Sequence, residues 1–164
     1  MKILAIIPAY NEAKGIGDLV KQAQGFGLDT LIIDDGSNDA TALIAKNSGA
    51  MLLQHKKNLG KGTSLRDGFD FALKNNYAAV ITMDGDGQHS PNDLPKFLDG
   101  LNNPEAAIVI GSRMQNTEGM PLVRILTNKF MSFVLSKVCR QSIADTQCGY
   151  RVIRSEILKK ANLS

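Results

Sequence analysis

The sequence predicts an α/β fold in which helices cover a mostly parallel sheet. Short apolar runs alternate along the 164-residue chain with segments whose apolar residues recur at helical spacing. Because the short runs are apolar almost throughout, they indicate strands buried on both faces, as in parallel sheets. Repeated strand–helix units of this length favour an α/β sandwich, and the chain is long enough for one compact domain.

The individual elements follow from these two patterns. The predicted strands are the short apolar runs at residues 2–7, 31–33, 51–53, 78–83 and 106–110. The predicted helices are the periodic segments between them, around residues 16–23, 40–48, 65–73 and 91–101. Ser37, Asn38 and Asp39 are candidate N-caps for the second helix, which Gly49 would end.

Composition and charge exclude several classes of protein. With 43% hydrophobic and 21% charged residues, the chain has ordinary globular usage, unlike disordered or fibrous proteins. A net charge of +3 is too small to indicate nucleic-acid binding, so no nucleic-acid partner is expected. Two cysteines, Cys139 and Cys148, are too few for a disulfide scaffold and suit a reducing cytoplasm.

The N-terminal apolar run is too short for a secretion signal or a membrane span. Pro8 ends this run, and polar Asn11 and Glu12 follow at once. No apolar stretch approaches the ~20 residues that a membrane-spanning helix needs. We therefore expect a cytoplasmic protein, with attachment to the inner face of the membrane still allowed.

Polar, glycine-rich segments follow the predicted strands. They are Pro8–Glu12, Asp34–Ser37, Asp84–His89 and Gly111–Arg113. The carboxyl ends of parallel strands meet at one edge of a sheet, and ligands of such sheets bind there. We expect these segments to form the functional site.

Asp84 and Asp86 predict a divalent-cation site. Two carboxylates ~4 Å apart repel by roughly 4 kcal/mol at an effective dielectric constant of about 20. Mg²⁺ or Mn²⁺ removes that repulsion, and these ions accept one or two carboxylates together with phosphate oxygens. An isolated Asp-Gly pair is more often simply a turn, but here a second acidic turn, Asp34–Ser37, follows another strand. We therefore interpret the two carboxylates as ligands.

Three common motifs that contain similar residues do not fit. An EF-hand loop starting at Asp84 would need Asp or Asn at its fifth position and Glu at its twelfth, where the chain has Gln88 and Pro95. Gly60–Ser64 is similar to the end of a P-loop, but His55 occupies the position of its first glycine. The glycine fingerprint of dinucleotide-binding folds is missing after the first strand.

Taken in order along the chain, a set of motifs resembles the family 2 glycosyltransferases of GT-A fold. The motifs are Ile7–Glu12, Asp34–Ser37, Asn58–Gly62, Asp84–His89, Gly111–Arg113 and Asp145–Arg151. The resemblance is greatest to the branch that makes dolichyl- or polyprenyl-phosphate mannose and glucose. The resemblance covers nearly the whole chain. Each motif alone is weak evidence, but the six motifs in this order identify the family strongly. The resemblance implies a Rossmann-like α/β sandwich with a mostly parallel central sheet.

The resemblance also implies a role for each matching position. The residues expected to bind substrate are Pro8, Tyr10, Glu12, Asp35, Lys61, Asp84, Arg113 and Arg124. Among them, Asp35 would hydrogen-bond the nucleotide base, and the two arginines would hold phosphate of the donor or the acceptor. The residues expected to bind Mg²⁺ or Mn²⁺ are Asp84, Asp86 and Gln88. Asp86 and Asp145 are the catalytic candidates, since some relatives place a base in the motif of Asp145.

The segment 119–144 contains no Asp or Glu and predicts a basic amphipathic helix. Its apolar residues Leu122, Leu126, Phe130, Phe133 and Val134 fall at helical spacing. Such a helix suits an anionic membrane surface or a lipid phosphate. An ordinary helix that packs its apolar stripe on the sheet fits the periodicity equally well. The family resemblance favours the membrane or acceptor role.

These expectations combine into one hypothesis with two alternatives. The chain would move a hexose from a GDP- or UDP-linked sugar to a polyprenyl phosphate of the dolichyl type, with a divalent metal. The first alternative is transfer to a soluble sugar or protein acceptor. The second is a catalytically silent domain that binds nucleotide sugars. Residues 1–164 would form a single catalytic domain that lacks the C-terminal segment of longer relatives.

Overall fold

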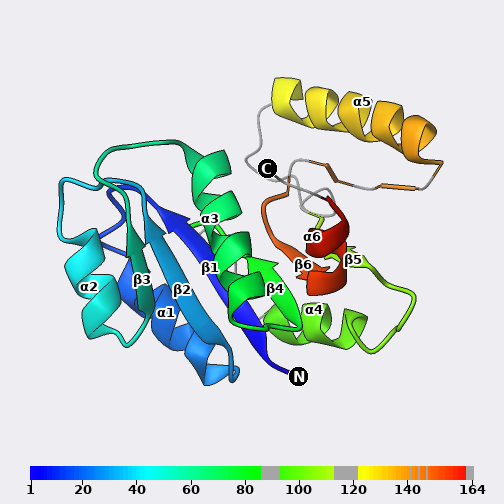
Figure 1. Cartoon of the computed structure of the whole chain (residues 1–164). Coiled ribbons are helices and arrows are strands. Elements are labelled where there is room, and N and C mark those ends of the chain that lie inside the picture. The colour runs from blue at the N-terminus through cyan, green and yellow to red at the C-terminus, as the bar shows by residue number, and fades with distance from the viewer. Residues whose placement is uncertain (86–92, 113–121, 141, 144, 147, 162–164) are drawn as a thin grey trace. The chain divides into compact units, whose positions relative to one another are not determined.

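The fold was obtained as a computed structural model that describes residues 1–85, 93–112, 122–140, 142–143, 145–146 and 148–161. Strands and helices alternate along most of the chain (Figure 1). The strands are β1 (Ile3–Ala9), β2 (Asp29–Asp34), β3 (Met51–Gln54), β4 (Ala79–Thr82), β5 (Ile108–Ile110) and β6 (Arg151–Arg154). The helices are α1 (Ile16–Gly25), α2 (Thr41–Asn47), α3 (Lys61–Lys74), α4 (Leu94–Gly100), α5 (Leu122–Cys139) and α6 (Ser155–Ala161).

The strands form one sheet in the order β3-β2-β1-β4-β6-β5. β1 pairs in parallel with β2 and β4, and β2 pairs in parallel with β3. β6 runs antiparallel to β4. The predicted mostly parallel α/β sheet is therefore confirmed. Ala9 lies opposite Asp34 at the ends of β1 and β2, so the segments that follow these strands leave the sheet at the same level.

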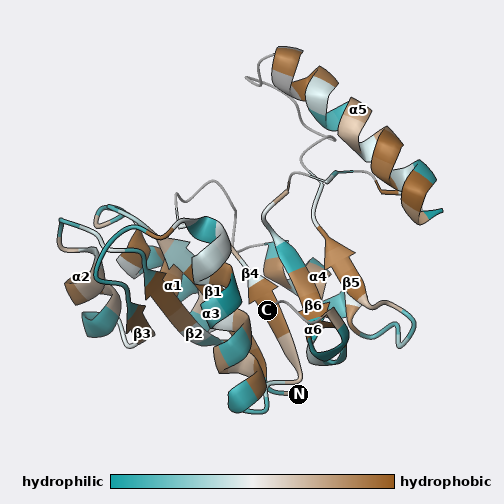
Figure 2. Cartoon of the chain, turned by 45° about the horizontal axis from the view of Figure 1, so that its top comes forward, coloured by the Kyte–Doolittle hydropathy of each residue, from teal (hydrophilic) through white to brown (hydrophobic). Residues whose placement is uncertain are grey.

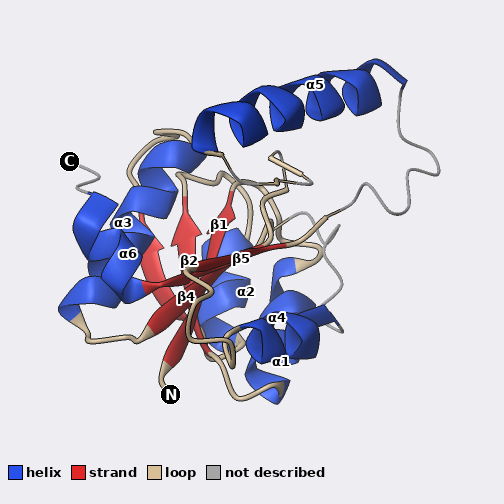
Figure 3. Ribbon diagram, turned by 90° about the vertical axis from the view of Figure 1, so that its right-hand side faces the viewer, coloured by secondary structure: helices blue, strands red, loops and turns tan. Residues whose placement is uncertain are grey.

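Helices cover both faces of the sheet (Figure 3). On one face, Leu4, Ile6, Leu31 and Ile33 of the central strands pack in a buried cluster with Ala72 of α3 and Leu158 of α6. On the other face lie α1, α2 and α4 (Figure 3). The core sits around β1, where Leu4, Ala5, Ile6 and Ile7 are fully buried. This burial on both faces explains why β1 is apolar throughout.

A close approach between α3 and β1 depends on one glycine. A Cβ atom added at Gly68 of α3 would lie 2.5 Å from Cγ2 of Ile6 and 3.2 Å from Cδ1 of Ile33. The absence of a side chain at Gly68 therefore lets the helix lie directly on the sheet. This contact holds α3 in place, and with it the N-terminal end of α3 beside the end of β1.

The C-terminal elements β6 and α6 have no counterpart among the predicted elements. β6 is only four residues long and enters the sheet between β4 and β5, so its pairing depends on residues far away in sequence. The predicted strand at 106–110 is shorter in the structure, where β5 covers Ile108–Ile110.

The chain forms two compact units, and each is described by itself. The first consists of Met1–Val109 with Tyr150–Ser164 and holds nearly the whole sheet; the second is Ile110–Gly149 and contains α5. None of the helices described is both long enough and apolar enough to pass through a membrane. The organisation of residues 1–164 as a single catalytic domain stays a prediction.

Candidate functional site

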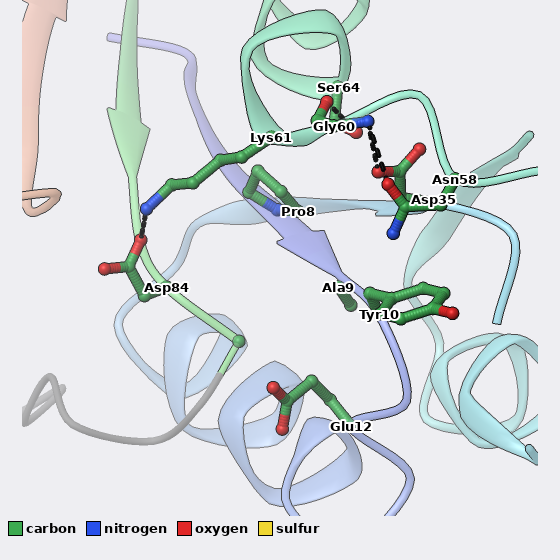
Figure 4. Close-up of a pocket in the computed structure, with 11 residues that line it drawn as sticks. Pro8, Ala9, Tyr10, Glu12, Asp35, Asn58, Gly60, Lys61, Ser64 and Asp84 are labelled. Atoms are coloured by element: carbon green, nitrogen blue, oxygen red, sulfur yellow. Dashed lines mark hydrogen bonds and ion pairs between the residues drawn. The ribbon is translucent and has the colours of Figure 1, made fainter.

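A pocket opens at the carboxyl edge of the sheet in the first unit, where Figure 4 shows its lining residues. Its volume is about 310 Å³. Its lining residues come from the ends of β1, β2 and β4 and from the start of α3: Pro8, Ala9, Tyr10, Glu12, Asp35, Asn58, Gly60, Lys61, Ser64, Asp84 and Gly85. The structure thus brings together six residues predicted to bind substrate, namely Pro8, Tyr10, Glu12, Asp35, Lys61 and Asp84. Their predicted roles on a ligand stay predictions.

Hydrogen bonds fix the segment after β1 to the segment after β2. The Asp35 N–H donates to the Ala9 carbonyl over 2.8 Å, so the sheet pairing continues one step past the strands. Asn11 adopts a φ of 59°, and its side-chain oxygen accepts from the N–H of Asn38 over 2.9 Å. Its own N–H donates to Oγ of Ser37 over 2.9 Å. The Pro8–Glu12 side of the pocket is held by these contacts.

Thr41, the first residue of α2, also forms hydrogen bonds to both of these segments. Its Oγ1 accepts from the Glu12 N–H over 2.8 Å and donates to the Asp39 carboxylate. Asp39 also accepts from the N–H groups of Thr41 and Ala13 over 2.9 and 3.2 Å. These bonds lower the pKa of Asp39, the Thr41 hydroxyl contributing most. The prediction of Ser37, Asn38 or Asp39 as N-cap is wrong, because the N-cap of α2 is Ala40 and no side-chain hydrogen bond caps the helix. Asp39, one residue earlier, instead joins the β1 loop to the start of α2.

Asp35 is buried, being 4% exposed, and its carboxylate holds the loop that leads into α3. Oδ1 accepts from the Leu59 N–H and Oδ2 from the Gly60 N–H, each over 2.8 Å. Oδ1 also lies 2.7 Å from Nδ1 of His55. Burial alone would raise the pKa of Asp35, but the hydrogen bonds from His55, Leu59 and Gly60 outweigh it and lower the pKa below 3.8. Asp35 is therefore ionised at neutral pH.

The acidic turn after β2 requires a glycine at position 36. Its φ is +75°, and a Cβ atom there would lie 2.5 Å from the carbonyl carbon of Lys57. The backbone of residues 57–58 therefore passes directly over Gly36. This close approach brings the Asn58–Lys61 stretch to the pocket.

The pocket carries opposite charges on two of its sides. Lys61 begins α3, and the helix N-terminus adds a partial positive charge from its unpaired N–H groups. Asp84 follows β4, and its carboxylate forms an ion pair with the Lys61 ammonium (Figure 4). Glu12 adds a second carboxylate to the lining. The positive side suits phosphate groups, and the carboxylate side suits a cation.

The surroundings of Asp84 fit a metal ligand. Its side chain is 18% exposed, it faces the pocket, and its carboxylate already takes a cationic partner from the opposite side. The other predicted metal ligands, Asp86 and Gln88, lie outside the described residues, as does Arg113. The predicted metal set therefore stays a prediction, with Asp84 as the member that the structure describes.

Asp145 lies in the second unit, where it joins α5 to the segment that follows it. Asp145 is 2% exposed, and its Oδ1 accepts from Nδ2 of Asn128 over 2.8 Å and from the Cys148 N–H over 3.1 Å. One turn along α5, Oγ of Ser132 donates to Oδ1 of Asn128 over 3.3 Å and accepts from the Thr146 N–H over 3.2 Å. Asp145 thus has an observed structural role, and its catalytic role stays a prediction. Arg124 lies on α5, and its contact with phosphate also stays a prediction.

α5 buries polar side chains and exposes apolar ones. Asn128 and Ser132 are 4% and 6% exposed. The exposed apolar residues of α5, which Figure 2 colours brown along the helix, are Val123, Leu126, Phe130, Met131, Phe133, Val134 and Val138. The basic residues Lys129 and Lys137 are exposed as well. This pattern is the reverse of an ordinary surface helix of a globular protein.

Three residues of this region were not among the predicted site residues, namely Ser64, Asp67 and His55. Ser64 is fully buried one turn into α3, and its hydroxyl donates to the Gly60 carbonyl over 3.4 Å. The helical spacing between Gly60 and Ser64 is the sequence signal that places Ser64 on the pocket side. No sequence pattern places Asp67 opposite His55.

Comparisons with known proteins identify the family of this chain. A family model described as glycosyl transferase family 2 matches residues 4–161. An uncharacterized protein of Methanocaldococcus jannaschii is 36% identical over 96% of this chain and 73% of its own length. A UDP-N-acetylglucosamine–dolichyl-phosphate N-acetylglucosaminyltransferase of Methanococcus voltae is 32% identical over 96% of this chain and 71% of its own length. A polyprenol monophosphomannose synthase of Mycolicibacterium smegmatis is 29% identical over 99% of this chain and 65% of its own length.

Solved structures share the fold. Mannosyl-3-phosphoglycerate synthase from Rubrobacter xylanophilus superposes with a TM-score of 0.77 at 19% identity, over 96% of this chain. Glucosyl-3-phosphoglycerate synthase from Mycobacterium tuberculosis, in complex with Mn²⁺, UDP-glucose and phosphoglyceric acid, gives a TM-score of 0.68 at 21% identity. The chain spans 54% and 58% of these two structures. With the family match over nearly its whole length and the GT-A-like sheet in place, the chain belongs to glycosyl transferase family 2 as a glycosyltransferase domain.

Proposed function

We propose that this chain transfers a hexose from a GDP- or UDP-linked sugar to a polyprenyl phosphate, with Mg²⁺ or Mn²⁺ bound at the sheet edge. The observation that carries the proposal is the pocket in which Lys61 and the N-terminus of α3 face the carboxylate of Asp84. A nucleotide diphosphate with a divalent cation has the complementary pair of charges. The names of two relatives, a dolichyl-phosphate transferase and a polyprenol monophosphomannose synthase, support the lipid phosphate as acceptor.

The donor would lie along the pocket from Tyr10 to Asp84. Tyr10 is 43% exposed and offers a ring face for a nucleoside, with Pro8 beside it. The diphosphate would then reach the N–H groups at the start of α3 and the Lys61 ammonium. Asp84, with Asp86 and Gln88, would hold the cation. When bound, this cation supplies positive charge to the departing diphosphate.

The reaction needs little proton transfer from the protein. An oxygen of the acceptor phosphate attacks the anomeric carbon, the bond from that carbon to the diphosphate oxygen breaks, and the nucleoside diphosphate leaves with the bonding electrons. Because a phosphate monoester is already anionic at neutral pH, no strong general base is required. We therefore assign Asp145 the function of joining the Cys148 backbone to Asn128 of α5. We assign Arg113 and Arg124 the function of binding phosphate.

α5 is the proposed contact with the membrane that carries the acceptor. Its exposed Phe130 and Phe133, with Lys129 and Lys137, combine an apolar surface with positive charge. Helices of this kind bind at anionic bilayer surfaces. Co-sedimentation with vesicles of anionic and of zwitterionic lipid tests this step, and the double variant Phe130→Ser/Phe133→Ser should stay in the supernatant. Equal sedimentation of this variant and the wild type would remove α5 from the proposal.

Product partition tests the transferase proposal as a whole. The full chain would be incubated with radiolabelled UDP- and GDP-sugars, Mn²⁺ and a polyprenyl phosphate, and the label counted in the organic and aqueous phases. Label in the organic phase that requires both polyprenyl phosphate and Mn²⁺ supports the proposal. Label transferred only to an added soluble acceptor would redirect it to a soluble product. Neither transfer nor donor hydrolysis, with nucleotide still bound, would indicate a silent nucleotide-sugar-binding domain.

A further inference from the structure

His55 lies between two carboxylates that come from different elements. It follows β3 directly, and its side chain is 11% exposed. Nδ1 is 2.7 Å from Oδ1 of Asp35, at the end of β2, and Nε2 is 2.8 Å from Oδ2 of Asp67, on α3. His55 is not one of the residues that line the pocket, but Asp35 is. His55 is therefore connected to the pocket through Asp35.

This geometry requires a doubly protonated ring. A neutral imidazole carries one N–H and one lone pair, so one ring nitrogen would point its lone pair at a carboxylate oxygen. In the imidazolium form both nitrogens donate, and both contacts become charge-assisted hydrogen bonds. In agreement, the pKa of His55 is raised above 6.5, mainly by its hydrogen bond to Asp35, and further by Asp67.

The hydrogen bonds of Asp35 connect His55 to the start of α3 at the pocket. Its two oxygens receive the N–H groups of Leu59 and Gly60, the last two residues before α3. Lys61 follows as the first residue of α3, and its ammonium reaches Asp84. Asp35 therefore links His55 to the Leu59–Gly60 backbone that leads into the N-terminus of α3.

We propose that His55 is a positioning residue, whose imidazolium fixes Asp35 and through it the Leu59–Lys61 start of α3 in the form that binds a nucleoside diphosphate. Binding then weakens when His55 loses its proton. The inference rests on the proposed function, since it concerns the same pocket. It adds a residue outside the pocket that controls binding there.

The charged groups around His55 set the direction of the effect. Asp35 faces it from the end of β2 and Asp67 from α3. Lys56 and Lys57 follow on its own segment, while Asp34 is engaged by Gln54 over 2.9 Å on the strand before it. The two facing carboxylates retain the proton, so affinity is highest at neutral and acidic pH. It falls as pH rises through the raised pKa of His55.

The first experiment measures the charge of His55 directly. The chain contains two histidines, His55 and His89, so ring ¹⁵N spectra are simple, and the variant His89→Gln identifies the signals of His55. Both ring nitrogens of His55 should carry protons at pH 7 and titrate at a pH above 6.5. A single ring proton at pH 7 would overturn the inference.

The second experiment measures Mg²⁺-dependent binding of UDP and of GDP from pH 6 to pH 9.5 by calorimetry. For the wild type, affinity should fall about tenfold as His55 titrates, the size expected for losing a charge-assisted hydrogen bond. Asp67→Asn removes one carboxylate from His55 at a site outside the pocket. It should move the midpoint of this decline to lower pH, whereas His55→Gln should bind about tenfold more weakly at pH 6 and show no such decline.

The outcomes separate the inference from the proposed function. If the wild type binds nucleotide but Asp67→Asn leaves the pH profile in place, His55 does not position the pocket and only this inference falls. If the wild type binds neither UDP nor GDP at any pH, the proposed function falls together with it. The titration of the nucleotide itself is the same in every arm, so it does not affect the comparison. Asp67→Asn keeps the test open even if His55→Gln does not fold.

Discussion

The Lys61 ammonium and the Asp84 carboxylate form an ion pair across the pocket, joining the first residue of α3 to the residue that follows Met83 after β4. The pair gives a cationic partner to a carboxylate that is mostly shielded from solvent. We predict that a divalent cation bound at Asp84 competes with this ammonium for the carboxylate. The displaced Lys61 would then be available to the diphosphate of the proposed donor.

Removing the charge of Lys61 should separate metal binding from nucleotide binding. We expect Lys61→Met to bind Mn²⁺ alone about threefold more tightly, because the metal no longer competes with the ammonium. The same variant should bind UDP or GDP with Mn²⁺ more weakly, because a phosphate contact is lost. Calorimetric titrations measure both, and Lys57→Met, outside the pocket lining, is the matched control. Unchanged Mn²⁺ affinity in Lys61→Met would contradict the competition.

Asp84 should be required for metal-dependent nucleotide binding. Asp84→Asn keeps the size of the side chain but removes its charge, so we expect affinity for nucleoside diphosphate with Mn²⁺ to fall more than about tenfold. The double change Asp84→Ala/Asp86→Ala should abolish the metal dependence. A thermal-shift titration with and without Mn²⁺ checks both, with Asp18→Asn on the exposed face of α1 as control. Full metal dependence in the double variant would refute the metal assignment.

Two glycines of α3 should respond in opposite directions to the same substitution. Gly68→Ala forces a methyl group to within 2.5 Å of Ile6 Cγ2, and overpacking of this kind costs about 1–3 kcal/mol of unfolding free energy. Gly62→Ala meets no atom within 4 Å, so it should gain up to about 1 kcal/mol from helix propensity. Urea denaturation measures both free energies. Equal effects of the two changes would show that α3 does not rest on β1 through Gly68.

The stability of the fold should depend on pH through His55 and Asp35. The pKa of His55 is raised, so its contribution is fully present below pH 6.5 and is lost as pH rises through the raised value. The pKa of Asp35 is lowered, so its contribution is present above pH 3.8 and is lost as pH falls. Melting temperatures from pH 3 to pH 10 test this. The alkaline decline should be absent in His55→Gln, and its persistence there would assign it to another group.

Asp145 should stabilise the second unit. Asp145→Ala removes the carboxylate oxygen that accepts from Nδ2 of Asn128 and from the Cys148 N–H, and we expect a loss of about 1–3 kcal/mol of unfolding free energy. Asp145→Asn keeps an acceptor oxygen at the same place and should lose less. Hydrogen exchange of the α5 amides reports the difference. Protection unchanged by Asp145→Ala would show that Asp145 does not hold α5.

The sequence by itself determined the mostly parallel part of the sheet, without β6, and the edge of the sheet at which the pocket opens. β1 is apolar throughout and β2 contains the apolar run Leu31–Ile33 because both faces of these strands are buried, and that requirement is visible in consecutive residues. The acidic and glycine-rich segments follow the ends of strands, and the topology of a parallel sheet places those ends at the same edge. Local signals of this kind depend on residues close together in the chain, so they can be interpreted without the fold.

Only the tertiary structure decided what these residues contact. Asp35 and His55 are 20 residues apart, and Lys61 and Asp84 are 23 apart, so neither pair follows from a helical or strand repeat. β6 pairs with β4, where Thr82 lies opposite Arg151 and Ala79 opposite Arg154, residues 69 and 75 positions apart in the sequence, so no local pattern predicts the pairing. Whether a carboxylate is buried, paired or available to a ligand depends on which distant segments the packing places around it. Packing of that kind is a property of the whole folded chain, since each contact is stabilised by the others.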